Sequence, residues 1–559
     1  MSQEMRLLLW LVVSANHGAG AARPFYLLDP GNFSEFYDED LAWAVEHVPF
    51  FEASERAFTE AFAFRWRLYK RHTVATSGTW NGHPAPSYVV TEFDPTVKVG
   101  QGGAFNTISC AAMHHISEGR WLRDRQIVRD YGSFWMRGGG QPRGYSFPAA
   151  HSLVELARTH GTLDLALSLL PELEANFEQW RHGNFVPERG LFYQTDTADG
   201  GEDSISGSGL RPSINFAMLG EMRALALLFN HTGNRTMADR FAAEAKELQS
   251  QIVRQLWSAD MRFFGVITWP YPPNCTSRKL SWRSGALGRP LSRCPGAPRW
   301  KNGSMPHVRE LFALSTPYYF RGLADVKGDF GVMWTQLTDG QGFSAPFGPR
   351  TAERRSALYN FSCDHACLWN APSWPFETSR VATALANYLT EPQSAPRTIG
   401  HAGYYSLMAN YTRSIVNSTA THPVDVYGRP VPAHPWTGED IHPDTGRWLA
   451  RDYLYAHDDK KKNRGWMYNH ATYCDNIIHG LVGIRSSLDT DVVTVQPLVP
   501  EGALSWFALD ALSYHAVHLT VFWDAEGSRY GKGAGLHVWV DGQPRAHRPD
   551  LGLLEVALV

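Results

Sequence analysis

Hydrophobic residues recur at helical spacing along most of this chain. The clearest stripes lie on either side of a predicted turn at Gly233. The first stripe consists of Ile214, Met218, Met222, Leu225 and Phe229, and the second of Phe241, Ala245, Leu248, Ile252 and Leu256. Steps of three and four residues place each set on one face of a helix, so the spacing predicts a pair of helices.

Similar stripes predict helices over most of the remaining chain. They lie near residues 37–70, 104–131, 145–180, 307–324, 376–390, 399–415 and 466–484. Pro375 stands where a first helical residue would, and proline is favoured at that position. About a dozen helices joined by long Gly- and aromatic-rich loops favour an α/α toroid over a bundle with short loops.

The last seventy residues have a different pattern. Residues 492–495, 517–523 and 536–540 are short runs rich in β-branched and aromatic residues, and apolar residues occupy every second position from 517 to 523. A turn signal, Asp541-Gly542, follows the last of these runs. We therefore expect a small β-sandwich over residues 489–559, packed closely against a mainly helical part over residues 23–488.

The N-terminus predicts a secretory signal over residues 1–22. Arg6 precedes a short apolar run, residues 7–13, and small residues follow through Ala22. Glu4 weakens the positive start of this pattern, and a buried first helix is the alternative interpretation. No other segment approaches the ~18 apolar residues of a membrane span, so no membrane partner is expected.

Glycosylation sequons and cysteines favour the same secretory compartment. Asn-X-Ser/Thr occurs eight times, whereas about two or three would be expected by chance. The sequons lie at Asn32, Asn230, Asn234, Asn274, Asn302, Asn360, Asn410 and Asn417. Six cysteines permit three disulfides, and we expect Cys275–Cys294 to close a Pro-rich loop. Cys363 and Cys367 lack a second cysteine pair, so a zinc site is not expected.

Charge and motifs exclude several functions. The net charge is −3, from 52 basic and 55 acidic side chains, which gives no reason to expect a nucleic-acid partner. The chain has no phosphate-binding glycine loop, no nucleophile elbow and no H-E-x-x-H motif. Its aromatic content is high, with 20 tryptophans, and aromatic faces are suited to stacking on sugars. His114 and His115 are adjacent in a predicted helix and point apart, which favours a packing role.

One loop is crowded with carboxylates. Residues 193–209 read YQTDTADGGEDSISGSG and contain Asp196, Asp199, Glu202 and Asp203. Their spacing does not match a calcium loop, which leaves a solvated surface loop or acid/base chemistry. A second acidic loop, WTGEDIHPDTGRW at residues 436–448, holds Glu439 beside Asp440. Glycoside cleavage needs two such carboxyl groups from different parts of a fold, one protonated and the other ionised.

The order of these motifs resembles the inverting six-hairpin glycosidases of clan G, which include glycoside hydrolase families 63 and 37 and mannosylglycerate-hydrolase-like proteins. GGEDSISGSGLRPSIN (200–215) resembles the segment that carries the family's general acid, and EDIHPDTG (439–446) resembles the pattern of its base. LWNAPSWPFETSRVATALANYL (368–389) is similar to a Trp-rich segment that lines the sugar pocket. NHATYCDNIIHGLVGI (469–484) resembles the final barrel helix, and the likeness covers roughly residues 37–486.

The resemblance implies an (α/α)6 toroid and an inverting glycosidase that acts on α-linked sugars. No cofactor is expected, and the sequence shows no dedicated metal site. It places the general acid at Glu202 and the base at Glu439. The usual acid in families 63 and 37 is Asp, so Asp203 stays a second candidate, and Asp199 and Asp440 are further acidic candidates. We expect enclosure and the negative neighbours Asp199 and Asp203 to raise the pKa of Glu202.

Several side chains are candidates for sugar binding, although each could equally be a packing residue. They are Trp66, Tyr145, Trp374, Glu377 and Trp466. His470 and Asp475 are expected to be structural. Two alternatives to the glycosidase remain: α-L-rhamnosidase-like or phosphorylase-like activity on the same fold, and a non-catalytic carbohydrate-binding protein. A phosphorylase would need a basic phosphate pocket in place of the base.

Overall fold

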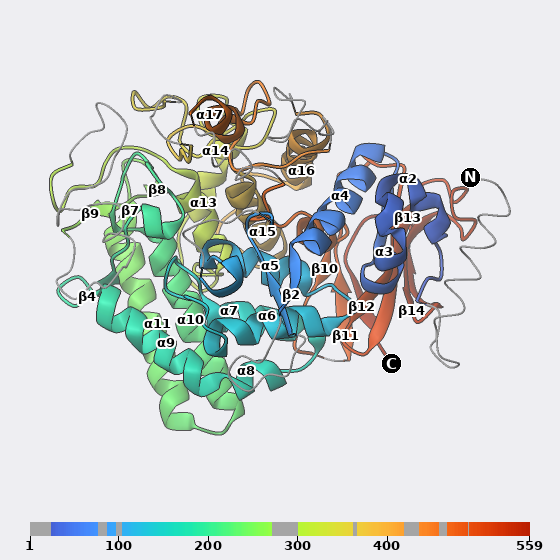
Figure 1. Cartoon of the computed structure of the whole chain (residues 1–559), viewed down its shortest axis with the longest axis horizontal. Helices are drawn as coiled ribbons and strands as arrows, with labels where there is room; N and C mark the ends of the chain where they lie inside the picture. The colour runs from blue at the N-terminus through green and yellow to red at the C-terminus, as the bar shows by residue number, and fades with distance from the viewer. Residues whose placement is uncertain are drawn as a thin grey trace.

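The protein is mainly helical, with a β-rich part at one side. A computed structural model describes residues 24–76, 87–96, 103–270, 300–360, 366–418, 435–457, 467–489 and 491–559. In Figure 1 the strands β12 (Trp506–Tyr514), β13 (Val517–Asp524) and β14 (Gly535–Val540) lie at one end of the molecule, and the helices α9 (Leu170–Asn184) and α11 (Arg235–Leu256) lie at the other. The expected signal peptide and the pair Cys275–Cys294 lie outside the described residues.

Six helices contact one another in chain order, and the last contacts the first. We call them the ring helices: α5 (Ala112–Gly119), α7 (Ala149–His160), α10 (Pro212–His231), α13 (Leu311–Tyr319), α15 (Pro375–Thr390) and α18 (Cys474–Asn476). The last continues as a π-helical turn over Ile477–Leu481. Since each ring helix lies beside the next, their N-terminal ends can bring distant loops together.

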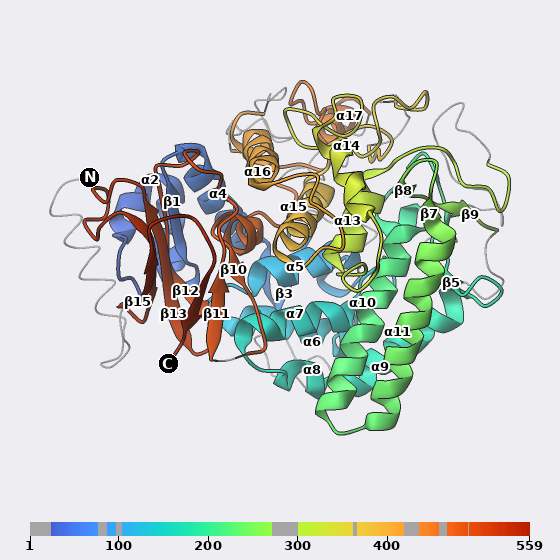
Figure 2. The same ribbon diagram turned by 180° about the vertical axis from the view of Figure 1, so that it is seen from behind.

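The other long helices pack against the ring helices. They are α4 (Arg56–His72), α6 (Arg125–Arg137), α9, α11 and α16 (His401–Val416). Helix α6 contacts α5, both α9 and α11 contact α10, and α16 contacts α15 and α4. Figures 1 and 2 show α5 and α15 between α4 on one side and α9 and α11 on the other.

Shorter helical elements lie between the long helices and near the chain ends. They are α2 (Ser34–Tyr37), α3 (Leu41–His47), α8 (Asp164–Ser168), α14 (Thr335–Thr338) and α17 (Leu449–His457), with 3-10 turns at Pro30–Phe33, Asp38–Asp40, Ala104–Asn106, Ser109–Ala111, Thr197–Asp199 and Phe330–Trp334.

The predicted helix pair at residues 212–256 is confirmed as α10 and α11. Pro212 occupies the first turn of α10, where a missing amide hydrogen costs nothing. Gly233 forms the turn with a φ of 78°, a left-handed conformation that favours glycine. The Asn234 side chain then caps α11 by accepting a hydrogen bond from the Met237 amide (3.2 Å). Both predicted stripes are buried, so core packing and local sequence agree here.

The β-rich part consists of two antiparallel sheets. The larger has the order β1 (Phe50–Ala53), β12, β13, β14 and β15 (Gln543–Arg548). The smaller joins β10 (Ile484–Arg485), β11 (Val492–Val495) and β16 (Leu554–Ala557). Strand β1 comes from a segment more than four hundred residues earlier in the chain than its partner β12. The N-terminal region therefore takes part in the sheet together with the last seventy residues.

Four short hairpins or strand pairs complete the described structure. They are β2 (Thr73–Thr76) with β3 (Ser87–Val90), β4 (Phe185–Val186) with β5 (Leu191–Phe192), β6 (Gly209–Leu210) with β9 (Ile267–Thr268), and β7 (Trp257–Ser258) with β8 (Phe263–Phe264). Strand β6 lies directly before α10, and its pairing with β9 fixes the end of the acidic loop 193–209.

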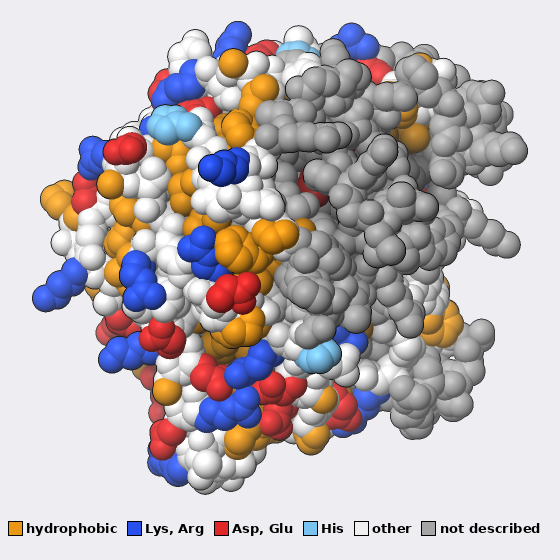
Figure 3. Space-filling model, turned by 90° about the vertical axis from the view of Figure 1, so that its left-hand side faces the viewer, with side chains coloured by type: hydrophobic (Ala, Val, Ile, Leu, Met, Phe, Trp, Pro, Cys, Tyr) orange, Lys and Arg blue, Asp and Glu red, His pale blue; other side chains and the backbone are white. Residues whose placement is uncertain are grey.

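Side chains of both signs mix on the visible part of the surface. Figure 3 shows lysine and arginine interspersed with aspartate and glutamate on the described part of one face, without a large region of a single sign. This pattern fits the nearly neutral net charge of −3.

Candidate active site

Loops at the N-terminal ends of neighbouring ring helices are joined by hydrogen bonds. The Ser146 amide, just before α7, donates to the carbonyl of Ala198 (3.0 Å) in the acidic loop before α10. Farther along the acidic loop, both the amide and the hydroxyl of Ser206 donate to the carboxylate of Glu310, which precedes α13. These bonds tie the acidic loop to both of its neighbours at the same end of the ring.

A segment before α15 joins the two predicted catalytic loops. We call residues 366–374 the bridging segment. The amide of Trp369 donates to the backbone carbonyl of Glu202 (3.0 Å), and the thiol of Cys367 donates to Oε2 of Glu439 (2.9 Å). Cys367 and Trp369 are only two residues apart, so their Cα atoms lie within about 7 Å of each other. Two loops more than two hundred residues apart in sequence therefore meet on three consecutive residues.

The loop that carries Glu439 is held by an apolar cluster and by strand-like pairing. Trp436, Ile441 and Trp448 pack together and are almost fully buried. Ile441 also exchanges two backbone hydrogen bonds with Ser373 of the bridging segment, both 2.9 Å long. Glu439 is only 2% exposed, so its position is set by the protein and not by bulk water.

Asp440, the neighbour of Glu439, has a structural position. Its Oδ1 accepts a hydrogen bond from the Ala450 amide (2.9 Å), and its carbonyl accepts one from the Leu449 amide (2.9 Å). Both amides lie in the first turn of α17, where backbone donors lack partners within the helix. Asp440 therefore caps α17, and the two adjacent acids have different surroundings.

The two acids of the predicted general-acid position also differ. Glu202 is half-buried, whereas Asp203 is 7% exposed. Asp203 has a φ of 58°, a left-handed conformation that is costly for most residues and tolerated by Asp. Such strained positions concentrate at functional sites. The loop thus offers a partly exposed glutamate and a buried aspartate side by side.

Asp199 forms a buried ion pair that the sequence analysis missed. Its Oδ2 accepts a hydrogen bond from Nε of Arg211 (2.7 Å), and both side chains are almost completely buried. Ser146 donates to the other carboxylate oxygen (2.7 Å). Arg211 also donates to Ser204 Oγ (3.1 Å) and so holds the acidic loop against α10. This pairing compensates the negative charge that we expected Asp199 to exert on Glu202.

Aromatic side chains line the bridging segment and the start of α15. Trp369 and Trp374 stack with ring centroids 4.8 Å apart, and Trp374 Nε1 donates to the carbonyl of Leu368 (2.6 Å). The Phe376 ring lies 5.9 Å from Trp369 and 6.1 Å from His470. Trp374 thus lies on the segment that joins the two acid loops. Trp369 and Phe376 were not among the predicted sugar-binding residues, although both fall within the Trp-rich motif 368–389.

The other predicted sugar-binding residues have different positions. Tyr145 lies beside the acidic loop, and its amide donates a hydrogen bond to Ser109 Oγ (3.1 Å). Glu377 is fully buried, pairs with Arg380 and accepts a hydrogen bond from Ser315. Burial raises the pKa of Glu377, and Arg380 opposes this effect. Glu377 is therefore anchored inside the ring.

Trp66 lies in the core of α4. It is fully buried and its ring contacts Phe62 and Tyr69 of the same helix. Within the part of the chain that the structure describes, no hydrogen bond or ring contact joins Trp66 to either acid loop. Trp466, the remaining candidate, lies outside the described residues.

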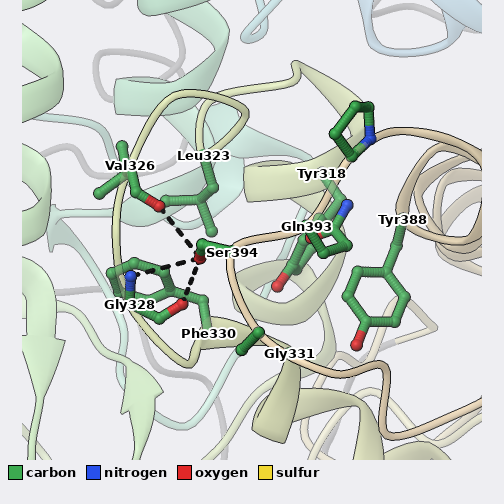
Figure 4. A pocket seen from close by; sticks show the side chains of 11 residues that line it. Tyr318, Leu323, Val326, Gly328, Phe330, Gly331, Tyr388, Gln393 and Ser394 are labelled. Carbon is green, nitrogen blue, oxygen red and sulfur yellow. Dashed lines mark hydrogen bonds between the residues drawn. The ribbon is translucent and has the colours of Figure 1, made fainter.

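A small surface pocket lies at the opposite ends of α13 and α15. It is drawn in Figure 4, where the hydroxyl of Ser394 donates to the Gly328 carbonyl (2.8 Å) and accepts from the Gly328 amide (3.3 Å). The lining residues are Tyr318, Leu323, Val326, Gly328, Phe330, Gly331, Tyr388, Pro392, Gln393, Ser394 and Ala395. None of these is acidic, so the pocket lacks the groups that glycoside cleavage requires.

Among the described residues, no group of three or more His, Cys, Asp and Glu side chains has the arrangement to hold a metal ion. No described helix is long and apolar enough to cross a membrane.

Comparison with known families places the chain in a described family. A family model described as "Mannosylglycerate hydrolase MGH1-like glycoside hydrolase domain" matches residues 104–458, more than half of the chain. The chain belongs to this glycoside hydrolase family. The predicted resemblance to the six-hairpin glycosidases is thereby confirmed. The match includes Glu202, Glu439 and the bridging segment between them.

Several solved structures resemble this glycoside hydrolase. One described as "Sialidase" is 28% identical with a TM-score of 0.78, over 95% of this chain and 45% of its own. This chain thus spans less than half the length of that protein. The GH63 mannosylglycerate hydrolase from Thermus thermophilus in complex with glucose is 11% identical, with a TM-score of 0.45 over 74% of this chain and 98% of its own.

A third structure, the GH78 family rhamnosidase of Bacillus sp. GL1, is 12% identical with a TM-score of 0.48, over 85% of this chain and 40% of its own. Curated proteins give no match to the chain.

Proposed function

We propose that this glycoside hydrolase inverts the anomeric centre of an α-linked sugar, with Glu439 as general base and an acid from residues 202–203 as general acid. One observation carries the proposal: the bridging segment binds the Glu202 carbonyl through Trp369 and the Glu439 carboxylate through Cys367. Inversion needs two carboxyl groups about 6.5–9.5 Å apart, with room for a water molecule between base and sugar.

The two carboxyl groups have separate tasks. The acid donates its proton to the glycosidic oxygen as the bond between that oxygen and the anomeric carbon breaks. The aglycone then leaves with this proton. Glu439 removes a proton from water as that water attacks the opposite face of the sugar. The thiol of Cys367 and the Trp436 cluster fix the position of Glu439. This supports its role as general base, because a general base must be held within hydrogen-bond reach of its water.

Glu202 is the first candidate for the acid and Asp203 the second. The half-buried Glu202 side chain has access to an incoming substrate, and its backbone is fixed by Trp369. Asp203 is more buried and has the strained backbone. Glu202→Gln and Asp203→Asn, assayed separately, assign the role. The substitution of the true acid lowers kcat by at least about 100-fold for substrates with poor leaving groups and by much less for activated aryl glycosides.

The six ring helices and the long helices beside them support an (α/α)6 toroid, with the acid loops at the N-terminal ends of the ring helices. The C-terminal strands support a β-sandwich that includes β1. We further propose that the enzyme is a secreted glycoprotein. Five sequon asparagines are exposed in the described residues, namely Asn32, Asn230, Asn234, Asn302 and Asn417.

A second candidate substrate is a sialoside. It is favoured by the 28% identity to the structure described as "Sialidase", which extends over 95% of this chain. The same acid and base loops would then act on a sugar that carries a carboxylate. Assays on aryl sialosides beside aryl α-mannosides, α-glucosides and α-rhamnosides distinguish the two candidates.

The experiment that tests the proposal compares matched acid variants on this substrate panel. We expect Glu439→Gln to lower kcat by about 100-fold or more, while Glu188→Gln, an exposed acid near the same loop, retains parental activity. Full activity of the Glu439→Gln variant would remove the assignment of the base. Activity that requires added phosphate would instead identify a phosphorylase, and a protein inactive on every glycoside would support a binding function.

A further inference from the structure

Three buried rings beside the bridging segment have polar atoms without partners. They are His114 at Nε2, Trp369 at Nε1 and His470, whose two ring nitrogens have no hydrogen bond of ordinary geometry and only a weak interaction with the Tyr468 backbone. The three residues are 1%, 1% and 3% exposed, respectively. More than nine in ten buried polar groups in proteins have a hydrogen-bond partner, and a group left without a partner is destabilising. Such groups therefore require a physical explanation, and a bound ligand would supply one.

All three rings surround one side chain, Phe376. Its ring centroid lies 4.4 Å from His114, 6.1 Å from His470 and 5.9 Å from Trp369. His114 comes from α5, Phe376 from the first turn of α15, and His470 from the loop before α18. The unpartnered atoms therefore belong to one cluster at the N-terminal ends of three ring helices. They are not scattered defects of the core.

The cluster lies next to both predicted catalytic loops. Trp369 holds the Glu202 carbonyl through its backbone amide. The Tyr468 ring lies 4.1 Å from His470, and burial together with the charges of Glu92 and Glu439 raises the pKa of Tyr468. His470 thus contacts Tyr468, whose pKa is raised in part by the charge of the proposed base, Glu439.

Neighbouring histidines show that the local fold normally satisfies its imidazoles. His115, next to His114, binds the Tyr131 hydroxyl through Nδ1 (2.9 Å) and the Asn469 carbonyl through Nε2 (2.7 Å). His72 binds the carbonyls of Thr91 (2.9 Å) and Met467 (2.7 Å). In contrast, among the described buried histidines only His470 lacks a hydrogen bond of ordinary geometry at both nitrogens, and its interaction with the Tyr468 backbone is weak. The lack of partners at His470 is therefore a local feature of this cluster.

Both unpartnered imidazoles are neutral near pH 7. Burial, followed by the charges of Arg380, His115 and Arg65, lowers the pKa of His114 well below its ordinary value. Burial, then His114, Arg65 and His115, does the same to the pKa of His470, and a weak interaction with the Tyr468 backbone opposes this shift. A neutral imidazole offers one donor and one acceptor. A sugar hydroxyl can also donate and accept, so it complements such a ring.

We propose that His114, His470 and the indole N–H of Trp369 form a subsite that binds the hydroxyl groups of the sugar ring cleaved by this enzyme. The proposal rests on the proposed function for its location beside the two acids. It extends that function by assigning recognition of a polyhydroxylated pyranose to three neutral groups. It also differs from the expectation that His114 and His470 serve only packing.

The test measures sugar binding and stability in the same variants. Thermal unfolding is followed for the parent chain, His470→Phe, His470→Leu and the control His115→Phe, with and without methyl α-mannoside, methyl α-glucoside, L-rhamnose and N-acetylneuraminic acid. We expect at least one sugar to raise the Tm of the parent, and both His470 variants to lose that response. Without sugar, the His470 variants retain the parental Tm or exceed it, whereas His115→Phe lowers it by breaking two hydrogen bonds.

A KM comparison on the hydrolysed substrate provides a second readout. Loss of one hydrogen bond to a hydroxyl raises KM by about tenfold and leaves the pH profile of kcat unchanged. The proposal is overturned if His470→Phe and His470→Leu retain the parental KM and the sugar response, if both destabilise the chain as much as His115→Phe, or if no sugar stabilises the parent. A Glu439→Gln variant that stays active while His470 proves necessary for sugar binding would instead refute the proposed mechanism alone.

Discussion

At the scale of single residues, the thiol of Cys367 is the most direct contact to the proposed base. Its hydrogen bond to Glu439 Oε2 (2.9 Å) fixes the direction of that carboxylate. We expect Cys367→Ala to lower kcat by about tenfold, because Glu439 loses the donor that orients it. Cys367→Ser keeps a donor and should retain most of the activity. Equal kcat values for both variants and the parent would show that this bond has no part in positioning the base.

A second residue-scale prediction concerns Glu221 of α10. Its carboxylate accepts a hydrogen bond from the His151 amide (2.7 Å) in the first turn of α7. Burial raises the pKa of Glu221 from 4.5 to about 7, although this bond opposes the shift. Because the folded-state pKa is raised, this carboxyl group stabilises the fold fully below pH 4.5, and the contribution is lost as pH rises toward 7. The free energy of unfolding falls by up to about 3 kcal/mol over this range.

Glu221→Gln should therefore remove this part of the pH dependence. Urea unfolding at pH 5 and pH 7.5 measures the difference between parent and variant. The exposed Glu188 provides the control, because Glu188→Gln should leave the parental dependence unchanged. A Glu221→Gln variant whose stability changes with pH as the parent's does would contradict the argument.

At the scale of residues, part of the candidate site could be predicted from the sequence alone. The motifs at 200–215 and 439–446 were sufficient to select two loops that the fold brings onto one bridging segment. The partners within each loop were not predictable, because they come from tertiary contacts. Asp199 is paired with Arg211, and Asp440 caps α17. Neither contact follows a local spacing rule.

At the scale of elements, the first described residues are bound to the sheet by one carboxylate. The amides of Tyr26, Leu27 and Leu28 all donate to Oδ2 of Asp510, at 3.2, 2.8 and 2.8 Å. Asp510 is fully buried in β12, and its Oδ1 accepts a hydrogen bond from Thr520 (2.6 Å). The segment therefore depends on a single side chain more than four hundred residues away.

Asp510→Ala should release this segment and destabilise the chain. Hydrogen bonds to a charged acceptor contribute about 1.5–3 kcal/mol each, and removal of the acceptor leaves several amides without a partner. We expect a loss of roughly 3 kcal/mol or more and faster amide hydrogen exchange at residues 26–28. The exposed Glu526 serves as control through Glu526→Ala. Unchanged exchange at residues 26–28 in Asp510→Ala would show that other contacts hold the segment.

Element prediction succeeded where the signal was local. The stripes at 212–256 correspond to α10 and α11, and Pro375 begins α15 as predicted. The alternation of apolar residues in β13 predicted the buried side chains less well. Thr520 and Phe522 are fully buried as well as Leu519 and Val521, because both faces of the sheet are covered. The pairing of β1 with β12 could not be predicted, since no turn or spacing links strands so far apart in sequence.

At the scale of the whole molecule, the exposed sequons predict a glycosylated, secreted enzyme. Asn230 and Asn234 lie at the turn between α10 and α11, whereas the acidic loop precedes the other end of α10. We expect protein secreted by eukaryotic cells to lose mass in several steps when treated with a peptide N-glycosidase. Asn234→Gln should remove one step. A protein of unchanged mass, retained inside the cell, would contradict the secretory assignment.

The central claim is that Glu439 activates water on the face of the sugar opposite to the acid. Proton NMR of the reaction on the best substrate of the panel tests it most directly, because the anomer released first is visible before mutarotation. The account predicts that the first anomer has the opposite configuration to the substrate, and that Glu439→Gln forms it much more slowly. A first product with the configuration of the substrate would mean a retaining reaction and would contradict the account.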